Sequence, residues 1–278
     1  MPDFVSLAST LTRRDPGIWF SRRSASVSYP ASGNAERLAV DERSFWFRHR
    51  NGCIISLVRR YPPHGCFLDI GGGNGFVSKG LTAAGLACAL LEPGIDGALA
   101  AHARDVDPVI CALLEDAALP AAGFAAAGMF DVVEHIEDEQ ATLKEVHRLL
   151  APNGHLFLTV PANPFLFSVD DVAAGHHRRY TISTLSRALD QAGFRVKFAS
   201  YIFAPLPPIL FLLRRAPGKF GLRRGHDPER DAAEYDPGGF AARIMDRTLA
   251  AELRRFEAGW SLPFGGSCIC VAEKLGKL

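Results

Sequence analysis

A short apolar run followed directly by a glycine-rich turn constrains this chain more than any other feature. Phe67–Ile70 reads Phe-Leu-Asp-Ile, and residues 71–75 follow as Gly-Gly-Gly-Asn-Gly. Glycine tolerates positive φ and has no Cβ, so a ligand can approach the backbone of such a turn closely. The helix expected after this turn would present free N–H groups at its start. The pattern predicts a strand–turn–helix unit that cradles a ligand.

After residue 62, short apolar runs alternate with helical stretches, which is typical of βα units around a parallel sheet. The runs are apolar throughout, as strands covered on both faces should be. The expected strands are residues 66–70, 87–91, 109–113, 124–130, 155–160 and 267–273. The expected helices are residues 44–61, 76–84, 97–104, 139–150, 181–192 and 240–256. The sequence therefore predicts an α/β fold.

The remaining segments define the expected domain organisation. Residues 1–43 are rich in Ser, Arg, Pro and Gly without a sustained period, so we expect an irregular N-terminal arm that builds no core. We assign residues 44–278 to one domain. A polar stretch rich in Arg and Gly predicts a surface insertion at residues 214–239. The apolar residues 194–213 are not assigned to an element.

Charge and composition disfavour several classes of protein. The 31 basic and 30 acidic residues give a net charge of +1, so the chain lacks the basic footprint of nucleic-acid binding. We recognise neither a secretory signal nor an apolar stretch long enough to span a bilayer, and we expect a cytoplasmic protein. The cysteines lack the paired spacing of zinc sites, so we expect buried reduced thiols and no metal site. They are Cys53, Cys66, Cys88, Cys111, Cys268 and Cys270.

The glycine turn does not complete the dinucleotide fingerprint Gly-x-Gly-x-x-Gly. Counting from Gly71 the last position is Phe76, and counting from Gly73 it is Ser78. Both are larger than the glycine that close helix–strand packing requires there, which disfavours a nicotinamide dehydrogenase. The spacing favours a ligand without phosphates that carries a charged amino-acid tail, and a tight structural turn is the alternative.

Two acidic residues follow the next expected strands. Glu92 lies roughly twenty residues after the glycines, where a ribose diol would lie. Asp116 follows the third expected strand, at the edge where open α/β sheets bind ligands. Each acid alone is more often a solvated loop residue, but together with the turn they support a nucleotide-like ligand.

Several further segments complete an ordered set of motifs. The set comprises residues 44–51 (SFWFRHRN), 67–75 (FLDIGGGNG), 91–93 (LEP), 115–117 (EDA), 130–138 (FDVVEHIED), 150–154 (LAPNG) and 175–180 (GHHRRY). With this set, residues 29–274 resemble the class I methyltransferases that use S-adenosylmethionine, especially the bacterial group related to ubiquinone-biosynthesis methyltransferases. Ala125 departs from this group, which often has Asp before the fourth strand.

The resemblance implies a Rossmann-like sheet of seven strands, with the last strand, residues 267–273, antiparallel. It also implies S-adenosylmethionine as the cofactor, bound across the carboxyl ends of the first four strands. The methionine part would lie against the turn, the ribose at the second strand, the adenine after the third, and the far side of the cofactor after the fourth. The implied cofactor-binding residues are Asp69, Gly71, Gly72, Gly73 and Gly75 for the methionine part, Glu92 and Pro93 for the ribose, Asp116 and Ala117 for the adenine, and Phe130 and Asp131 for the far side.

Candidate acceptor-side residues occupy three segments. His135 lies in the loop that faces the methyl group in related enzymes, so we expect a catalytic or substrate-contacting role, with a polar helix cap as the alternative. Trp46 and Arg48 belong to an aromatic segment that could cover the cofactor, or simply pack in the core. His176, Arg178 and Tyr180 belong to a basic segment that could bind an anionic acceptor, with a solvated turn as the alternative.

These residues lead to an expected reaction. We expect methyl transfer to oxygen, less favourably to nitrogen or carbon, of a small or lipid-like acceptor. The alternative is a module that binds S-adenosylmethionine without transferase activity. The apolar and then basic residues 201–224 predict a peripheral membrane contact, with sheet packing and a solvated loop as the alternative.

Overall fold

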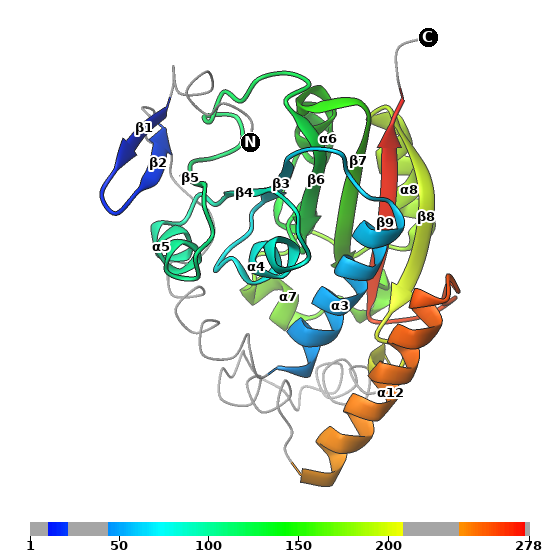
Figure 1. The fold of residues 1–278 in the computed structure, drawn as a ribbon. Coiled ribbons are helices and arrows are strands. Elements are labelled where there is room, and N and C mark those ends of the chain that lie inside the picture. Colours follow the sequence, from blue (N-terminus) through cyan, green and yellow to red (C-terminus); the bar gives the residue numbers. More distant parts are fainter. Residues whose placement is uncertain (1–10, 22–43, 208–238, 276–278) are drawn as a thin grey trace.

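The computed structural model describes residues 11–21, 44–207 and 239–275, and these residues build a single mixed sheet with helices on both faces (Figure 1). The strand order is β1-β2-β5-β4-β3-β6-β7-β9-β8. In that order the strands are Leu11–Arg14, Ile18–Ser21, Val109–Cys111, Cys88–Leu91, Phe67–Ile70, Phe124–Phe130, Leu150–Pro161, Ser267–Lys274 and Phe194–Ile202.

The sheet is mostly parallel, as expected, but it has nine strands in the described residues instead of seven. The expected antiparallel last strand is confirmed, because β9 runs antiparallel to both β7 and β8. The two additional strands, β1 and β2, form an antiparallel hairpin whose second strand pairs with β5.

This hairpin lies inside the arm that we expected to be irregular. Leu11 and Ile18 are buried there, so residues 11–21 contribute to the core. Two such residues are too few to produce a visible period in the sequence. Residues 1–10 and 22–43 of the arm lie outside the described residues.

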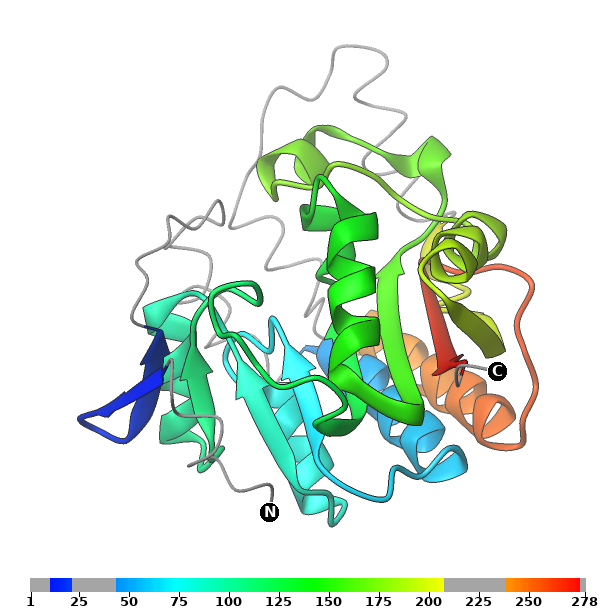
Figure 2. The same cartoon turned by 90° about the horizontal axis from the view of Figure 1, so that it is seen from above.

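Helices cover the sheet in two layers (Figure 2). One layer contains α3 (Phe45–Arg60), α4 (Phe76–Ala83), α5 (Ile95–Ala103) and α12 (Gly239–Glu257); the other contains α6 (Glu139–Leu149) and α8 (Ile182–Gln191), near the short α7 (Val169–Ala173). Alternate residues of β6 explain the division, because Ala126 and Phe130 pack toward α3 while Ala127 and Met129 pack toward α6.

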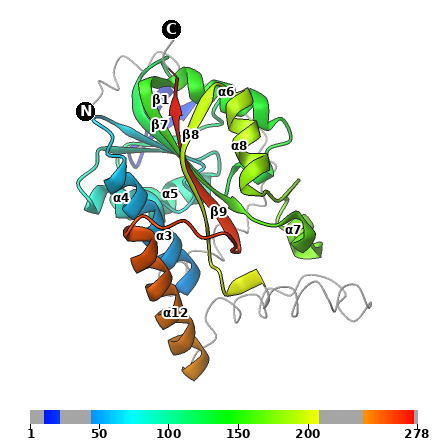
Figure 3. The same ribbon diagram turned by 90° about the vertical axis from the view of Figure 1, so that its right-hand side faces the viewer.

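Helix α12 lies alongside α3 at the end of the sheet that carries β8 and β9 (Figure 3). A buried pair joins the two helices, with His49 Nε2 2.8 Å from Glu252 Oε1. Glu252 also accepts hydrogen bonds from the backbone N–H groups of Phe203 (2.6 Å) and Ala204 (2.8 Å), which follow β8. One carboxylate therefore ties three segments together.

Much of the expected membrane-contact segment lies outside the described residues, as do residues 214–238 of the expected insertion. In the described part, Phe203 and Leu206 are buried in the core between the sheet and α3. These two side chains therefore cover the sheet. Within the described residues, none of the helices has the length and apolar character needed to cross a bilayer.

Candidate active site

Four loops converge at the carboxyl edge of the parallel strands. Strands β4, β3 and β6 pair in parallel, so the segments that follow them leave the sheet on the same side. The glycine turn follows β3, Glu92 follows β4, and Asp131 follows β6, while Asp116 comes after the neighbouring β5. An open α/β sheet binds its ligands at this edge.

Two glycines of the turn have different surroundings. Gly73 has a φ of +52°, and a Cβ added there would meet no atom of the described residues within 4 Å. Gly75 has a φ of +76°, and its Cβ would lie 2.8 Å from the Ala101 Cβ on α5. Gly73 therefore borders space that a ligand can use, while Gly75 allows α4 and α5 to pack closely.

Glu92 is buried beside this turn and holds it in place. Its Oε2 accepts a hydrogen bond from the Gly73 N–H (2.9 Å), and its Oε1 accepts one from the Gly94 N–H (2.8 Å). Burial raises the pKa of Glu92, and these two hydrogen bonds oppose that shift. Each carboxylate oxygen keeps a lone pair for a further donor such as a sugar hydroxyl.

Asp69 lies beneath the turn, with only 1% of its surface exposed. Its Oδ2 accepts a hydrogen bond from the Ser78 hydroxyl at 2.6 Å, whereas its Oδ1 is buried without a hydrogen-bond partner among the described residues. Burial raises the pKa of Asp69 to about 6, although the Ser78 hydroxyl and the Arg50 charge lower it. Oδ1 is therefore the atom through which Asp69 would contact the methionine part of the cofactor without giving up a hydrogen bond.

We predict that Asp69 makes the protein less stable as the pH rises from 4 to 6. Its pKa is raised from 3.8 to about 6 in the folded chain, so within this window the folded state binds more protons than the unfolded state. Stability then falls with rising pH, by about 2–3 kcal/mol in total. Denaturant titrations at several pH values should show this loss in the wild type and a smaller loss in Asp69→Asn. Equal pH slopes for the two proteins would contradict the prediction.

Asp131 directly follows β6 and has a left-handed conformation, with a φ of +58°. The Arg50 guanidinium pairs with its Oδ2, and the Thr159 hydroxyl donates to its Oδ1 at 3.1 Å. Arg50 is itself buried and lies over the Phe47 ring, at 5.2 Å from its centroid. A non-glycine residue held at positive φ by such partners is common at functional sites.

The other residues that we expected to bind the cofactor differ in their burial and in their contacts. Phe130 is 7% exposed and stacks on Phe67, so its ring belongs to the core and only its backbone faces the edge. Asp116 is half-buried, and its carbonyl oxygen accepts the Ser21 hydroxyl of β2 at 3.0 Å. Ala117 is fully buried, while Gly72 and Pro93 are half-buried. The hairpin thus supports the loop expected to meet the adenine.

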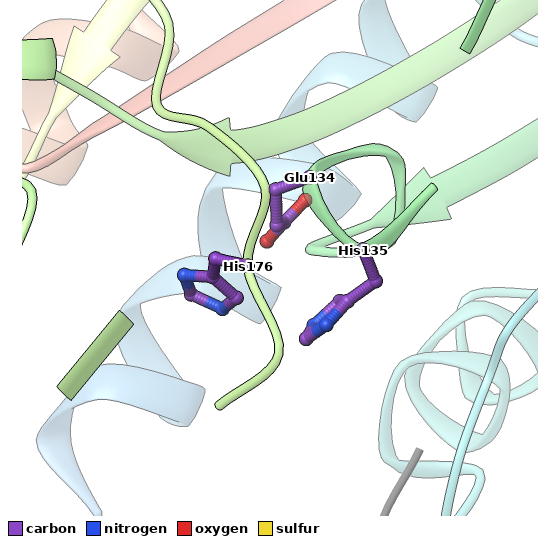
Figure 4. Close-up of side chains that lie close together, drawn as sticks. All are labelled: Glu134, His135 and His176. Carbon is purple, nitrogen blue, oxygen red and sulfur yellow. The ribbon is translucent and has the colours of Figure 1, made fainter. Parts of the chain in front are cut away.

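On the side of β6 and β7, Glu134, His135 and His176 come together (Figure 4). A carboxylate oxygen of Glu134 and one ring nitrogen of each histidine lie within 4.8 Å of one another. The centroids of the two imidazole rings are 4.7 Å apart in an edge-to-face arrangement. Glu134 is fully buried, whereas both histidines are half-buried. The structure therefore brings together two residues, His135 and His176, that the sequence placed in separate motifs.

The other expected acceptor-side residues are engaged in packing or ion pairs. Arg178 lies 3.0 Å from Glu139 Oε2 and donates to the Glu137 carbonyl at 2.8 Å. Tyr180 is 3% exposed and donates its hydroxyl to Glu139. A contact of either side chain with an acceptor would require it to leave these partners.

Trp46 and Arg48, which we expected to cover the cofactor, are also engaged in packing or an ion pair. Trp46 stacks on Phe203 with ring centroids 3.9 Å apart, and Arg48 is exposed and lies 3.1 Å from Asp246 Oδ1 on α12. The residue of this segment that reaches the site is Arg50, which we did not single out. Its position two residues after Arg48, on the opposite side of a helix, is the signal that could have identified it.

Residues 46–197 match a family model described as a methyltransferase domain. A protein of Mycolicibacterium smegmatis named "Probable S-adenosylmethionine-dependent methyltransferase/" is 27% identical over 180 residues, which are 63% of this chain and 68% of that protein.

Two solved structures are similar in fold. One is a Thermotoga maritima S-adenosylmethionine-dependent methyltransferase described as a "possible histamine N-methyltransferase" (TM-score 0.55, 17% identity, covering 88% of this chain and 100% of that one). The other is a Haemonchus contortus phosphoethanolamine N-methyltransferase in complex with S-adenosylmethionine (TM-score 0.57, 15% identity, covering 93% and 62%).

Proposed function

The chain belongs to the methyltransferase-domain family, whose model spans more than half of its residues, and from this premise we propose that it methylates an oxygen atom of a small or lipid-like acceptor. S-adenosylmethionine is the cofactor of this methyltransferase. The observation that best supports the proposed site is the pairing of Glu92 with the open Gly73 backbone at the carboxyl edge of β3 and β4.

The described residues fit this cofactor. The free space at Gly73 admits a ligand against the backbone, and the Asp69 Oδ1 atom offers a buried acceptor near the turn. Glu92 would bind the ribose hydroxyls, and the loop at Asp116 would meet the adenine. Asp131, fixed by Arg50 and Thr159, would line the far side.

When bound, S-adenosylmethionine supplies an electrophilic methyl group on a positively charged sulfur atom. The protein must then align an acceptor with that methyl group, and such positioning can supply much of the rate enhancement. We place His135 at the acceptor, because it lies in the segment that follows β6, four residues after Asp131, and is half-buried. An imidazole there can donate to or accept from an acceptor hydroxyl.

Transfer of a labelled methyl group tests the proposal. The full chain would be incubated with methyl-labelled S-adenosylmethionine and extracts rich in quinols, sugars or lipids, and each labelled product would be analysed for a new oxygen–methyl group. We expect an O-methylated product together with S-adenosylhomocysteine. A product methylated on nitrogen would contradict the oxygen assignment. Cofactor binding without turnover on any acceptor would instead favour a binding module.

Glu92→Ala is expected to weaken S-adenosylmethionine binding by about 1–3 kcal/mol, because charge-assisted hydrogen bonds to the ribose would be lost. Titration calorimetry measures the change. Glu115, which is exposed and precedes Asp116, offers a matched control, since Glu115→Ala also removes one negative charge. Wild-type affinity in folded Glu92→Ala would mean that this carboxylate only supports the turn.

A further inference from the structure

A carboxylate–histidine pair lies beside the acceptor side of the site. Asp171 Oδ1 is 2.9 Å from His176 Nδ1, and the His176 backbone N–H donates to the Asp171 carbonyl at 2.8 Å. The Asp171 side chain is 1% exposed and that of His176 is 16% exposed. The acid is therefore enclosed, while the imidazole retains access to a small molecule.

The partners of Asp171 fix its charge. Arg179 donates to both carboxylate oxygens, from Nε at 2.7 Å and from Nη2 at 3.1 Å, and the Ser168 N–H donates to Oδ2 at 2.9 Å. Although burial opposes it, the hydrogen bond from His176 and the Arg179 charge lower the pKa of Asp171 to about 2. Asp171 is therefore ionised at neutral pH and can only accept hydrogen bonds.

This charge state determines the tautomer of the imidazole. Because Asp171 accepts, His176 Nδ1 must carry a proton. In the neutral ring the lone pair then lies on Nε2, which makes Nε2 the atom that can take a proton from an acceptor. A buried acid that orients a histidine in this way is the arrangement used by general bases in other enzymes.

The pair lies next to the cofactor loops. A Cβ on Gly175 would be 3.8 Å from His135 Nδ1, and the His177 N–H donates to the Glu134 carbonyl at 2.8 Å. The loop that carries Glu134 and His135 also borders the glycine turn, because a Cβ on Gly71 would lie 2.7 Å from Val132 Cγ2. Contacts thus run from the glycine turn through residues 132–135 to the segment that holds His176.

We propose that His176, oriented by Asp171, is the general base that deprotonates the acceptor hydroxyl, an assignment that rests on the proposed function. As the acceptor oxygen bonds to the methyl carbon, the carbon–sulfur bond breaks and its electron pair remains on sulfur. The hydroxyl proton moves to His176 Nε2, and the imidazolium later releases it to water. Asp171 stabilises the imidazolium, and among the residues that the structure describes Arg179, Glu134 and His135 also face the pair.

Long-range proton–nitrogen NMR spectra of the histidine-labelled full chain test the pair without any acceptor. We expect the neutral His176 ring to be in the Nδ1–H tautomer, with its signals identified by their loss in His176→Gln. His177→Gln is the matched control, because His177 is the exposed neighbour. An Nε2–H tautomer at His176 would overturn the proposal.

Turnover with the acceptor found by the labelled-cofactor screen tests the proton transfer. His176→Gln should lower kcat about 10²- to 10⁴-fold and remove the acidic limb of the pH–rate profile, while S-adenosylmethionine affinity stays within about twofold. Added imidazole should partly restore His176→Gly. A His176→Gln variant with near wild-type kcat would overturn the assignment of His176 as the general base. Absence of turnover in the wild type would count against the proposed function, and the NMR spectrum would then decide whether Asp171 orients His176.

Discussion

Gly73→Val is expected to lower the affinity for S-adenosylmethionine by about 100-fold or more, which is at least about 2.7 kcal/mol of binding free energy. A Cβ added at Gly73 would lie more than 4 Å from every atom of residues 11–21, 44–207 and 239–275, so the new side chain would fill the space that the cofactor needs. The φ of +52° also makes the loop adjust around any L side chain, at about 1–2 kcal/mol. Titration calorimetry of the folded variant measures the loss.

Gly85→Val provides the matched control. Gly85 also has a positive φ, of +91°, and in the described part of the chain a Cβ there would also meet no atom within 4 Å, but Gly85 follows the far end of α4. Both variants therefore carry backbone strain without a clash, and only one reaches the proposed site. Gly71→Val is less informative, because its Cβ would lie 2.7 Å from Val132 Cγ2. Equal cofactor affinities for Gly73→Val and Gly85→Val would contradict the assignment of the turn.

Glu252→Ala is expected to lower the free energy of unfolding by about 3–5 kcal/mol, because each buried group left without its hydrogen-bond partner costs about 1–3 kcal/mol. The substitution removes the partner of His49 and leaves the N–H groups of Phe203 and Ala204 without their acceptor. Because this side chain links α12 both to α3 and to the residues that follow β8, the loss should be cooperative. Urea denaturation followed by circular dichroism measures it.

Arg48→Ala is the control for this prediction. Arg48 also joins α3 to α12, through Asp246, but both side chains are about half exposed. An exposed ion pair contributes about 0–1 kcal/mol, so the variant should unfold close to the wild type. A Glu252→Ala loss no larger than that of Arg48→Ala would show that the buried pair contributes little.

The sequence predicted the central part of the sheet well, because the signals there are local. Residues 124–130 coincide with β6, and the expected helix at 76–84 differs from α4 by one residue. The glycines and the short apolar runs lie next to each other in the chain, so neighbouring residues define the strand, turn and helix. The hairpin was missed because its pairing with β5 joins residues about ninety positions apart, and only Leu11 and Ile18 are buried in it.

The candidate site was only partly visible in the sequence. The glycines and Glu92 follow strands directly, so their position at the sheet edge could be predicted. The roles of Arg50 and Asp171 could not, because each depends on a partner that only the fold brings close. Asp171 in particular is paired with Arg179, eight residues away, across a short helix and a loop.

The binding site can be located most directly by hydrogen–deuterium exchange of the wild type with and without S-adenosylmethionine. The account predicts that the cofactor slows exchange in peptides covering residues 71–75, 92–94, 113–117 and 131–135, and leaves residues 11–14 and α12 unchanged. Protection confined to other segments, or no protection at a saturating cofactor concentration, would contradict the claim that the carboxyl edge of β3, β4, β5 and β6 holds S-adenosylmethionine.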